Sequence, residues 1–129
     1  MGKQLALAVV LAVVSSNAAA RWVAVGSSDD MTFYADPATI TRTGPIVQIV
    51  TLIDSKTARE GLAKPYRSAR GQQEYDCEKV RERSVAVTYY SGNMAGGEIV
   101  GTSSDSGAWE AIPPDTKAED IWKIVCSKP

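Results

Sequence analysis

Residues 46–53 read Ile-Val-Gln-Ile-Val-Thr-Leu-Ile, and this stretch decides the fold class. Most of its residues are β-branched, and it follows Gly44-Pro45 and ends at Asp54, the pattern of a β-strand bounded by turn residues. A strand with one face in solvent alternates more strictly between apolar and polar residues. Here each face carries three large apolar side chains, the two faces being Ile46/Gln48/Val50/Leu52 and Val47/Ile49/Thr51/Ile53. We therefore expect both faces of this strand to be covered.

Shorter extended segments lie on both sides of this strand. We predict them at residues 22–25, 31–34, 72–77, 83–90, 98–102 and 109–112. The glycine-rich residues 91–97 predict a hairpin connection. Asp36-Pro37 predicts a capped turn, in which the carboxylate accepts backbone N–H groups and the proline starts a helical turn.

The last element is the one convincing helix. Thr116-Lys-Ala-Glu119 fits a capping box, in which the hydroxyl and the carboxylate satisfy free backbone donors at the helix start. An apolar stripe at helical spacing follows, and Cys126 lies on the same side; the stripe is Ala118, Ile121, Trp122 and Val125. Many strands and one terminal helix predict an α+β domain, an antiparallel β-sheet packed by one C-terminal α-helix.

A single short helix covers only one face of a sheet. The second face of residues 46–53 then needs sheet curvature, a folded-back loop or a second subunit. Among these we expect a homodimer that buries this face.

The first twenty residues have the three parts of a secretory signal peptide. A basic start at Lys3 precedes the apolar run 5–14, and Ala18-Ala19-Ala20 supplies small residues before the cleavage point. The apolar run is too short to span a membrane. We therefore expect a signal peptide at 1–20, a single domain at 21–129, and a location in the periplasm or outside the cell. No cysteine lies near the cleavage point, so no lipid anchor is expected there.

Cys77 and Cys126 are the only cysteines of the chain. An oxidising compartment favours a disulfide between them, and this bond would staple the helix to the sheet. A redox or metal-binding pair is the alternative, but the spacing is not C-x-x-C and no third ligand cluster accompanies it.

The composition argues against several activities. The chain has no histidine, which excludes His-based catalysis and imidazole metal ligands. The carboxylate groups Asp29-Asp30 and Glu74-x-Asp76-x-Glu78 have basic neighbours or lie in a turn, and we expect ordinary solvated ion pairs rather than acid–base catalysis. No metal or cofactor motif is present, and the net charge of −1 argues against nucleic acid.

One charged segment carries a functional hypothesis. Residues 56–70 contain five cationic residues and a single acidic one, Glu60. The cations are Lys56, Arg59, Lys64, Arg67 and Arg70. They could form a contact patch for an acidic protein or glycan. The simpler interpretation, which we favour, is a mobile, solvated loop.

The order of these landmarks resembles the surface-adhesin protein E family of bacterial exported proteins. The resemblance covers nearly all of residues 21–129. It rests on Trp22, Phe33-Tyr-Ala-Asp36 before Thr39-Ile40, the strand ending at Asp54, Glu74-Tyr-Asp-Cys77, Arg81, Arg83, Tyr90, Ser91, Met94, Gly97, Trp109, Ile112, Pro114 and Cys126.

The resemblance implies a small antiparallel sheet packed by a C-terminal helix, with a disulfide that matches Cys77–Cys126. It also implies a binding protein rather than an enzyme, displayed on the surface and engaging host matrix or serum proteins. The alternative is a soluble periplasmic structural or stress-related protein with an endogenous bacterial partner.

Overall fold

The computed structural model describes residues 21–127 of the chain. The signal peptide predicted for residues 1–20 lies outside the described residues. The stretch that begins at Ile46 forms the centre of the architecture as β3 (Ile46–Arg59), which continues past the end expected at Asp54. It pairs with β2 (Met31–Thr43) on one side and with β4 (Tyr66–Asp76) on the other.

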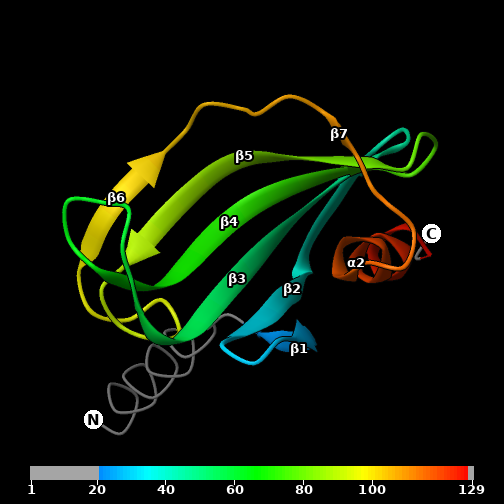
Figure 1. The fold of residues 1–129 in the computed structure, drawn as a ribbon. Coiled ribbons are helices and arrows are strands. Elements are labelled where there is room, and N and C mark those ends of the chain that lie inside the picture. Colours follow the sequence, from blue (N-terminus) through cyan, green and yellow to red (C-terminus); the bar gives the residue numbers. More distant parts are fainter. Residues whose placement is uncertain (1–20, 128–129) are drawn as a thin grey trace, which may run out of the picture.

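All strands join one antiparallel sheet, drawn in Figure 1. The order β1-β2-β3-β4-β5-β6 follows the chain, so each strand pairs with the next one in sequence. Short β7 pairs with the beginning of β5. The remaining strands are β1 (Val23–Ser27), β5 (Arg81–Tyr90), β6 (Ile99–Ser103) and β7 (Glu110–Ala111), and the helix is α2 (Lys117–Cys126). The predicted α+β class is confirmed.

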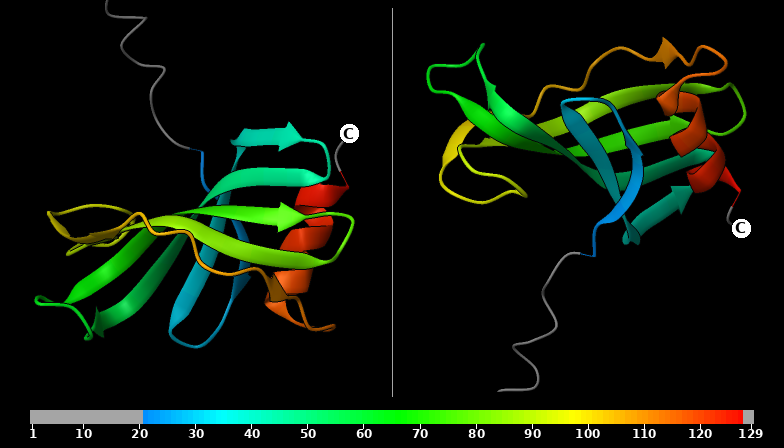
Figure 2. Two further views of the ribbon diagram at one scale, coloured as in Figure 1. Left: turned by 90° about the horizontal axis from the view of Figure 1, so that it is seen from above. Right: turned by 60° about the horizontal axis from the view of Figure 1, so that its bottom comes forward.

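The sheet is strongly twisted, and α2 covers only one end of it. Figures 1 and 2 show the helix at one end and the turn between β3 and β4 at the opposite end. The face that packs against α2, here called the helix face, carries Val47 and Ile49, which are fully buried. They form the core together with Ala35, Tyr75, Ile112 and Val125.

The second face of β3 is covered in part by a loop that folds back. Leu52 points to this face and is 0% exposed. Asp54, two residues further on the same face, accepts hydrogen bonds from the backbone N–H of Met94 (2.7 Å) and from Asn93 Nδ2 (3.1 Å). The folded-back loop, one of the three solutions expected from the sequence, therefore holds this end of the face.

The predicted helix signals are confirmed. Thr116 Oγ1 accepts from Glu119 N–H at 3.2 Å, and the Glu119 carboxylate accepts in return from the N–H of Asp115 at 3.1 Å. The carboxylate thus reaches one residue further back than in the standard capping box. Together the two bonds fix where α2 begins.

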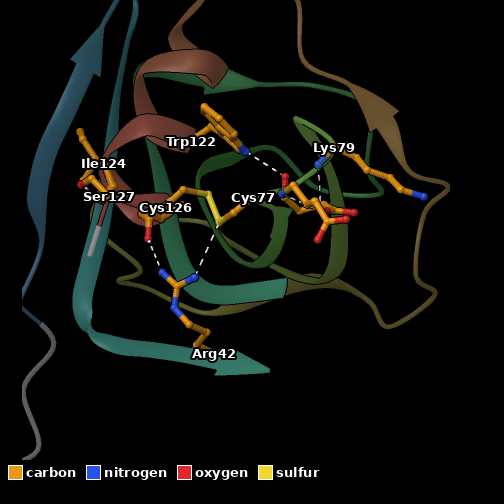
Figure 3. The surroundings of a disulfide bond; sticks show 10 residues. Arg42, Cys77, Lys79, Trp122, Ile124, Cys126 and Ser127 are labelled. Atoms are coloured by element: carbon orange, nitrogen blue, oxygen red, sulfur yellow. Dashed lines mark hydrogen bonds between the residues drawn. A yellow bond between two sulfur atoms is a disulfide. The ribbon is translucent and has the colours of Figure 1, made fainter. Parts of the chain in front are cut away.

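A disulfide between Cys77 and Cys126 fastens α2 to the end of β4, as Figure 3 shows. Beside it, Trp122 Nε1 donates to the carbonyl of Asp76 at 2.9 Å. Arg42, in strand β2, donates from Nη2 to the carbonyl of Val125 at 3.4 Å. The predicted staple is confirmed, and two hydrogen bonds between the helix and the sheet flank it.

The capped helical turn predicted at Asp36-Pro37 is wrong. Strand β2 runs through it, with an irregular register between Asp36 and Thr41. Asp36 Oδ1 accepts from Ala38 N–H at 3.1 Å as expected, but Thr39 Oγ1 accepts from Val50 N–H at 2.9 Å across the sheet. The threonine hydroxyl thereby keeps a donor of β3 satisfied where the ladder is interrupted, so the chain makes a bulge and stays in the sheet.

Removing the disulfide is expected to destabilise the domain substantially. The bond closes a loop of sequence separation 49, for which the chain-entropy model gives about 4 kcal/mol of stabilisation. Urea unfolding of the Cys77→Ala/Cys126→Ala variant, compared with the oxidised wild type, measures this loss. The wild type under reductant should lose as much, and an unchanged unfolding midpoint would contradict the expectation.

Candidate binding surface

The basic segment forms the outer half of a β-hairpin, so the expected mobile loop is wrong. Residues 56–59 complete β3 and residues 66–70 begin β4, and only residues 60–65 connect them. Arg67 Nη1 donates to the carbonyl of Lys56 at 2.9 Å across this hairpin. The segment was misjudged because its apolar residues are few, whereas strand pairing here depends on the neighbouring strands.

The structure divides the five predicted cations. Lys56, Arg59, Lys64 and Arg67 lie on the outer hairpin, whereas Arg70 points to the opposite face of the sheet beside Leu52. Lys64 is 66% exposed and lies 3.6 Å from Glu98, an exposed ion pair that contributes at most about 1 kcal/mol. A single patch of five cations is therefore not formed.

The two arginines of the outer hairpin differ in their partners. Arg59 is held by Ser55 Oγ at 3.0 Å and by the Asp30 carboxylate at 3.2 Å. Arg67 makes its hydrogen bond to a backbone carbonyl and has no carboxylate partner within residues 21–127. Arg67 and the exposed Lys56, which also has no carboxylate partner within residues 21–127, are thus the cations of this hairpin with charge left to offer a ligand.

Both arginines border a groove in the helix face, which we call the hairpin groove. It has a volume of about 290 Å³ and is lined by Met31, Ile53, Ser55, Arg59, Tyr66, Arg67, Ala69, Val87 and Tyr89. Tyr66 and Tyr89 form an edge-to-face pair with ring centroids 4.9 Å apart. Ile53 is 37% exposed on its floor. The groove combines an apolar floor with cationic edges, and no local sequence pattern indicates it because its lining comes from four different strands.

The loop between β5 and β6 holds the hairpin from the other face of the sheet. Ser68, 1% exposed, donates to the carbonyl of Gly92 (2.7 Å) and accepts from Ala95 N–H (2.9 Å). At Gly97, φ is +74°, and an added Cβ would collide with the Ser91 hydroxyl. This turn therefore requires glycine, and it supports the base of the hairpin.

A second cavity lies between α2 and the sheet, with a volume of about 160 Å³. Ile53 lines both this cavity and the hairpin groove. Burial raises the pKa of the Tyr75 hydroxyl far above its ordinary value, and the Glu82 carboxylate adds to the rise. The buried Gln73 Oε1 has no hydrogen-bond partner. These polar groups gather at the end of the cavity that is remote from the hairpin.

Two carboxylates face each other at the edge of this region. Glu82 and Glu110 are paired directly across β5 and β7. Burial raises the pKa of Glu82, and the Glu110 charge raises it further. Like charges directly opposite in a sheet are destabilising. The sequence offered no sign of this pair because the pairing of β7 with β5 cannot be deduced from local residue patterns.

Among the carboxylates weighed as acid–base catalysts, Asp30, Glu74 and Asp76 are held in ion pairs. Glu74 pairs with Arg83 at 2.8 Å, and Asp76 pairs with Arg81 at 3.0 Å. Burial raises the pKa of Asp76, but hydrogen bonds from the N–H groups of Lys79 and Glu78 and from Arg81 outweigh it and leave the pKa lowered. The lowered pKa keeps the Asp76 carboxylate ionised, as expected of a structural ion pair.

The described residues contain neither a metal-binding cluster nor a membrane-spanning helix. No group of three or more His, Cys, Asp or Glu side chains in residues 21–127 could hold a metal ion. No helix in that range is long and apolar enough to cross a membrane.

Replacing Glu82 with glutamine is expected to stabilise the domain at neutral pH. The raised pKa means that the folded state disfavours the charged carboxylate, so the penalty is present above the folded pKa and disappears as the pH falls through it. We expect a gain of roughly 0.2–1 kcal/mol at pH 7 and none at acidic pH. Urea unfolding at both pH values measures this.

Glu110→Gln should give a similar gain because it removes the same repulsion. Glu78→Gln, in the exposed turn after β4, serves as the neutral control. A loss of stability in Glu82→Gln at pH 7 would show that the carboxylate makes a favourable contact instead.

The chain belongs to the surface-adhesin protein E family, whose model matches residues 22–127. The resemblance expected from the sequence is thus confirmed. No curated protein sequence matches the chain.

Solved structures of protein E from Haemophilus influenzae have the same fold. One has a TM-score of 0.65 at 15% identity, covering 82% of this chain and 83% of that chain. Crystal form II has a TM-score of 0.63 at 14% identity, covering 85% of this chain and 97% of that one. Protein E from non-typeable Haemophilus influenzae has a TM-score of 0.64 at 15% identity, covering 85% of this chain and 79% of that chain.

Proposed function

We propose that this member of the family is an exported, non-enzymatic protein-binding module that meets a host matrix or serum protein through its β3–β4 hairpin. The observation that carries the proposal is the placement of Lys56, Lys64 and Arg67 on a hairpin that extends beyond the part of the sheet packed by α2. Family membership supports a role in adhesion.

The hairpin is suited to binding because it is already ordered. The bond from Arg67 to the Lys56 carbonyl ties its two strands, and the ion pair of Arg59 with Asp30 ties it to the turn before β2. The β5–β6 loop braces its base through Ser68. A preordered surface loses little conformational entropy when a partner binds.

The charges on this surface favour a protein over a polyanion. Acidic side chains are interleaved with the cations, since Asp30, Glu60 and Glu98 lie at or near the hairpin. Nucleic-acid binding needs many cations that neutralise successive phosphates. A mixed pattern instead provides specificity for a protein surface of complementary pattern.

Charge reversal on the hairpin is expected to weaken binding at least tenfold. The Lys64→Glu/Arg67→Glu variant of residues 21–129 should bind immobilised matrix proteins more weakly than the wild type in surface plasmon resonance. Lys79→Glu/Lys123→Glu makes the same change in charge at exposed residues away from the hairpin and is the matched control. Equal binding by both variants would refute the hairpin as the contact surface.

Protease treatment of intact cells separates adhesion from the alternative function. An adhesin is expected to be digested without lysis, as followed by antibody. Protection until the outer envelope is permeabilised would favour the alternative, a soluble periplasmic structural or stress-related protein with a bacterial partner. The homodimer expected from the sequence stays a prediction, and it would use the face of β3 that carries Ile46 and Val50.

A further inference from the structure

The hairpin groove and the cavity beside α2 follow one another along the helix face. Ile53 lines both, and together they form what we call the apolar trough. It runs from Arg67, past Tyr89 and Ile53, to Phe33 and to Ile121 of the helix. Apolar side chains thus line two neighbouring hollows that meet at Ile53 in the middle of a sheet face, where a monomer of this size would be expected to bury them.

Position on the sheet face restricts the kind of molecule that fits. The backbone groups of the trough floor are used within the sheet, because Ile53 pairs with Ala69 and Ala69 pairs with Tyr89. An extended peptide lying there would leave its own N–H and C=O groups without partners, at a cost of about 1–3 kcal/mol for each buried group. A hydrocarbon chain has no such groups and loses nothing in this environment.

One end of the trough supplies a charge for an anionic head group. Arg67 lines this end, and no carboxylate within residues 21–127 neutralises it. Arg59 lies beside it but is engaged by Asp30. A guanidinium binds a carboxylate with two parallel hydrogen bonds, so a carboxylate head fits Arg67 better than a neutral or cationic one.

The opposite end limits the length of the chain that can be buried. Gln73, Tyr75, Glu82 and Lys117 line the cavity there, and they end its apolar part. Along β3 the lining residues on this face run from Ser55 through Ile53 to Thr51, a distance of roughly 13 Å with the apolar Ile53 at its middle. The geometry therefore matches a ligand with one charged head and a chain of medium length.

We propose that the apolar trough binds a fatty acid, with its carboxylate at Arg67 and its hydrocarbon chain along Tyr89 and Ile53 toward Phe33. The site shares Arg67 with the protein-binding surface proposed above, but it needs no partner protein. An acidic peptide offers the same carboxylate, and the experiment separates the two sources.

Isothermal titration of residues 21–129 with fatty acids below their critical micelle concentrations tests the proposal. Decanoate is expected to bind one to one, and affinity should rise about fourfold per added methylene until the chain reaches the polar end. Decyltrimethylammonium, with the same chain and a cationic head, should bind at least tenfold more weakly. An acidic peptide such as acetyl-Asp-Leu-Asp-amide should show no binding in the same range.

Variants locate the site. Arg67→Ala should weaken decanoate binding about tenfold or more, whereas Arg70→Ala, on the opposite face, should leave it unchanged. Ile53→Asp should abolish binding. The matched control is Ile99→Asp, because Ile99 lies in β6 and is 61% exposed. It should leave binding unchanged. Circular dichroism checks that each variant is folded.

Amide chemical shifts of the wild-type protein provide a test that needs no variant. Decanoate should perturb Ala69, Val87 and Tyr89, which line the trough, and leave the Cys77 turn unaffected. Absence of binding, equal binding of the cationic amphiphile, or perturbations confined to other surfaces would each overturn the proposal. If the wild type does not bind fatty acid but the charge-reversal variant loses matrix binding, the fatty-acid proposal is wrong and the protein-binding function is supported.

Discussion

The constraint on which the whole structure depends is that one short helix packs on one long sheet. Helix α2 lies across the strands at one end of the sheet (Figures 1 and 2), so along β3 it covers about its own diameter, roughly 10–12 Å, whereas the 14 residues of β3 span roughly 46 Å. The helix can therefore bury the Val47–Ile49 end of the sheet and no more. The disulfide and the Trp122 hydrogen bond hold it at that end. Everything beyond Thr51 has to be stabilised in another way.

The two faces solve this problem differently. On the face opposite the helix, polar side chains pair with each other: Glu74 with Arg83, Asp76 with Arg81, and Trp109 over both arginines at 4.6 Å. The turn that carries Met94 closes over the far end of that face. On the helix face, α2 closes one side of the cavity at Ile53, but no element of residues 21–127 covers the hairpin groove beyond it.

The elements that could be predicted from the sequence are those with a strong local signal. The central strand has a β-branched pattern, α2 has a capping box and an apolar stripe, and an exported chain with two cysteines predicts the disulfide. The outer hairpin could not be predicted, because the residues of 56–59 have no strand pattern and are held by the cross-strand bond from Arg67. The bulge at Asp36 depends on a bond from Val50 in the next strand, which no local pattern contains.

The candidate site shows the same division. Four of the five predicted cations do lie on one hairpin. The net positive charge of the hairpin is smaller than their number suggests, because Asp30 and Glu98 neutralise two of them. The groove between them joins residues from β2, β3, β4 and β5, and its lining follows from register rather than from sequence order.

A short helix also gives the protein-binding and fatty-acid proposals a common physical origin. Because α2 packs only at the opposite end of the sheet, the outer hairpin lies outside the core and exposes its cations, and the apolar trough behind them stays accessible. Arg67 borders both surfaces. A carboxylate held at Arg67 would cancel the charge that a protein partner meets there, so the two ligands would compete at this residue without sharing the rest of their surfaces.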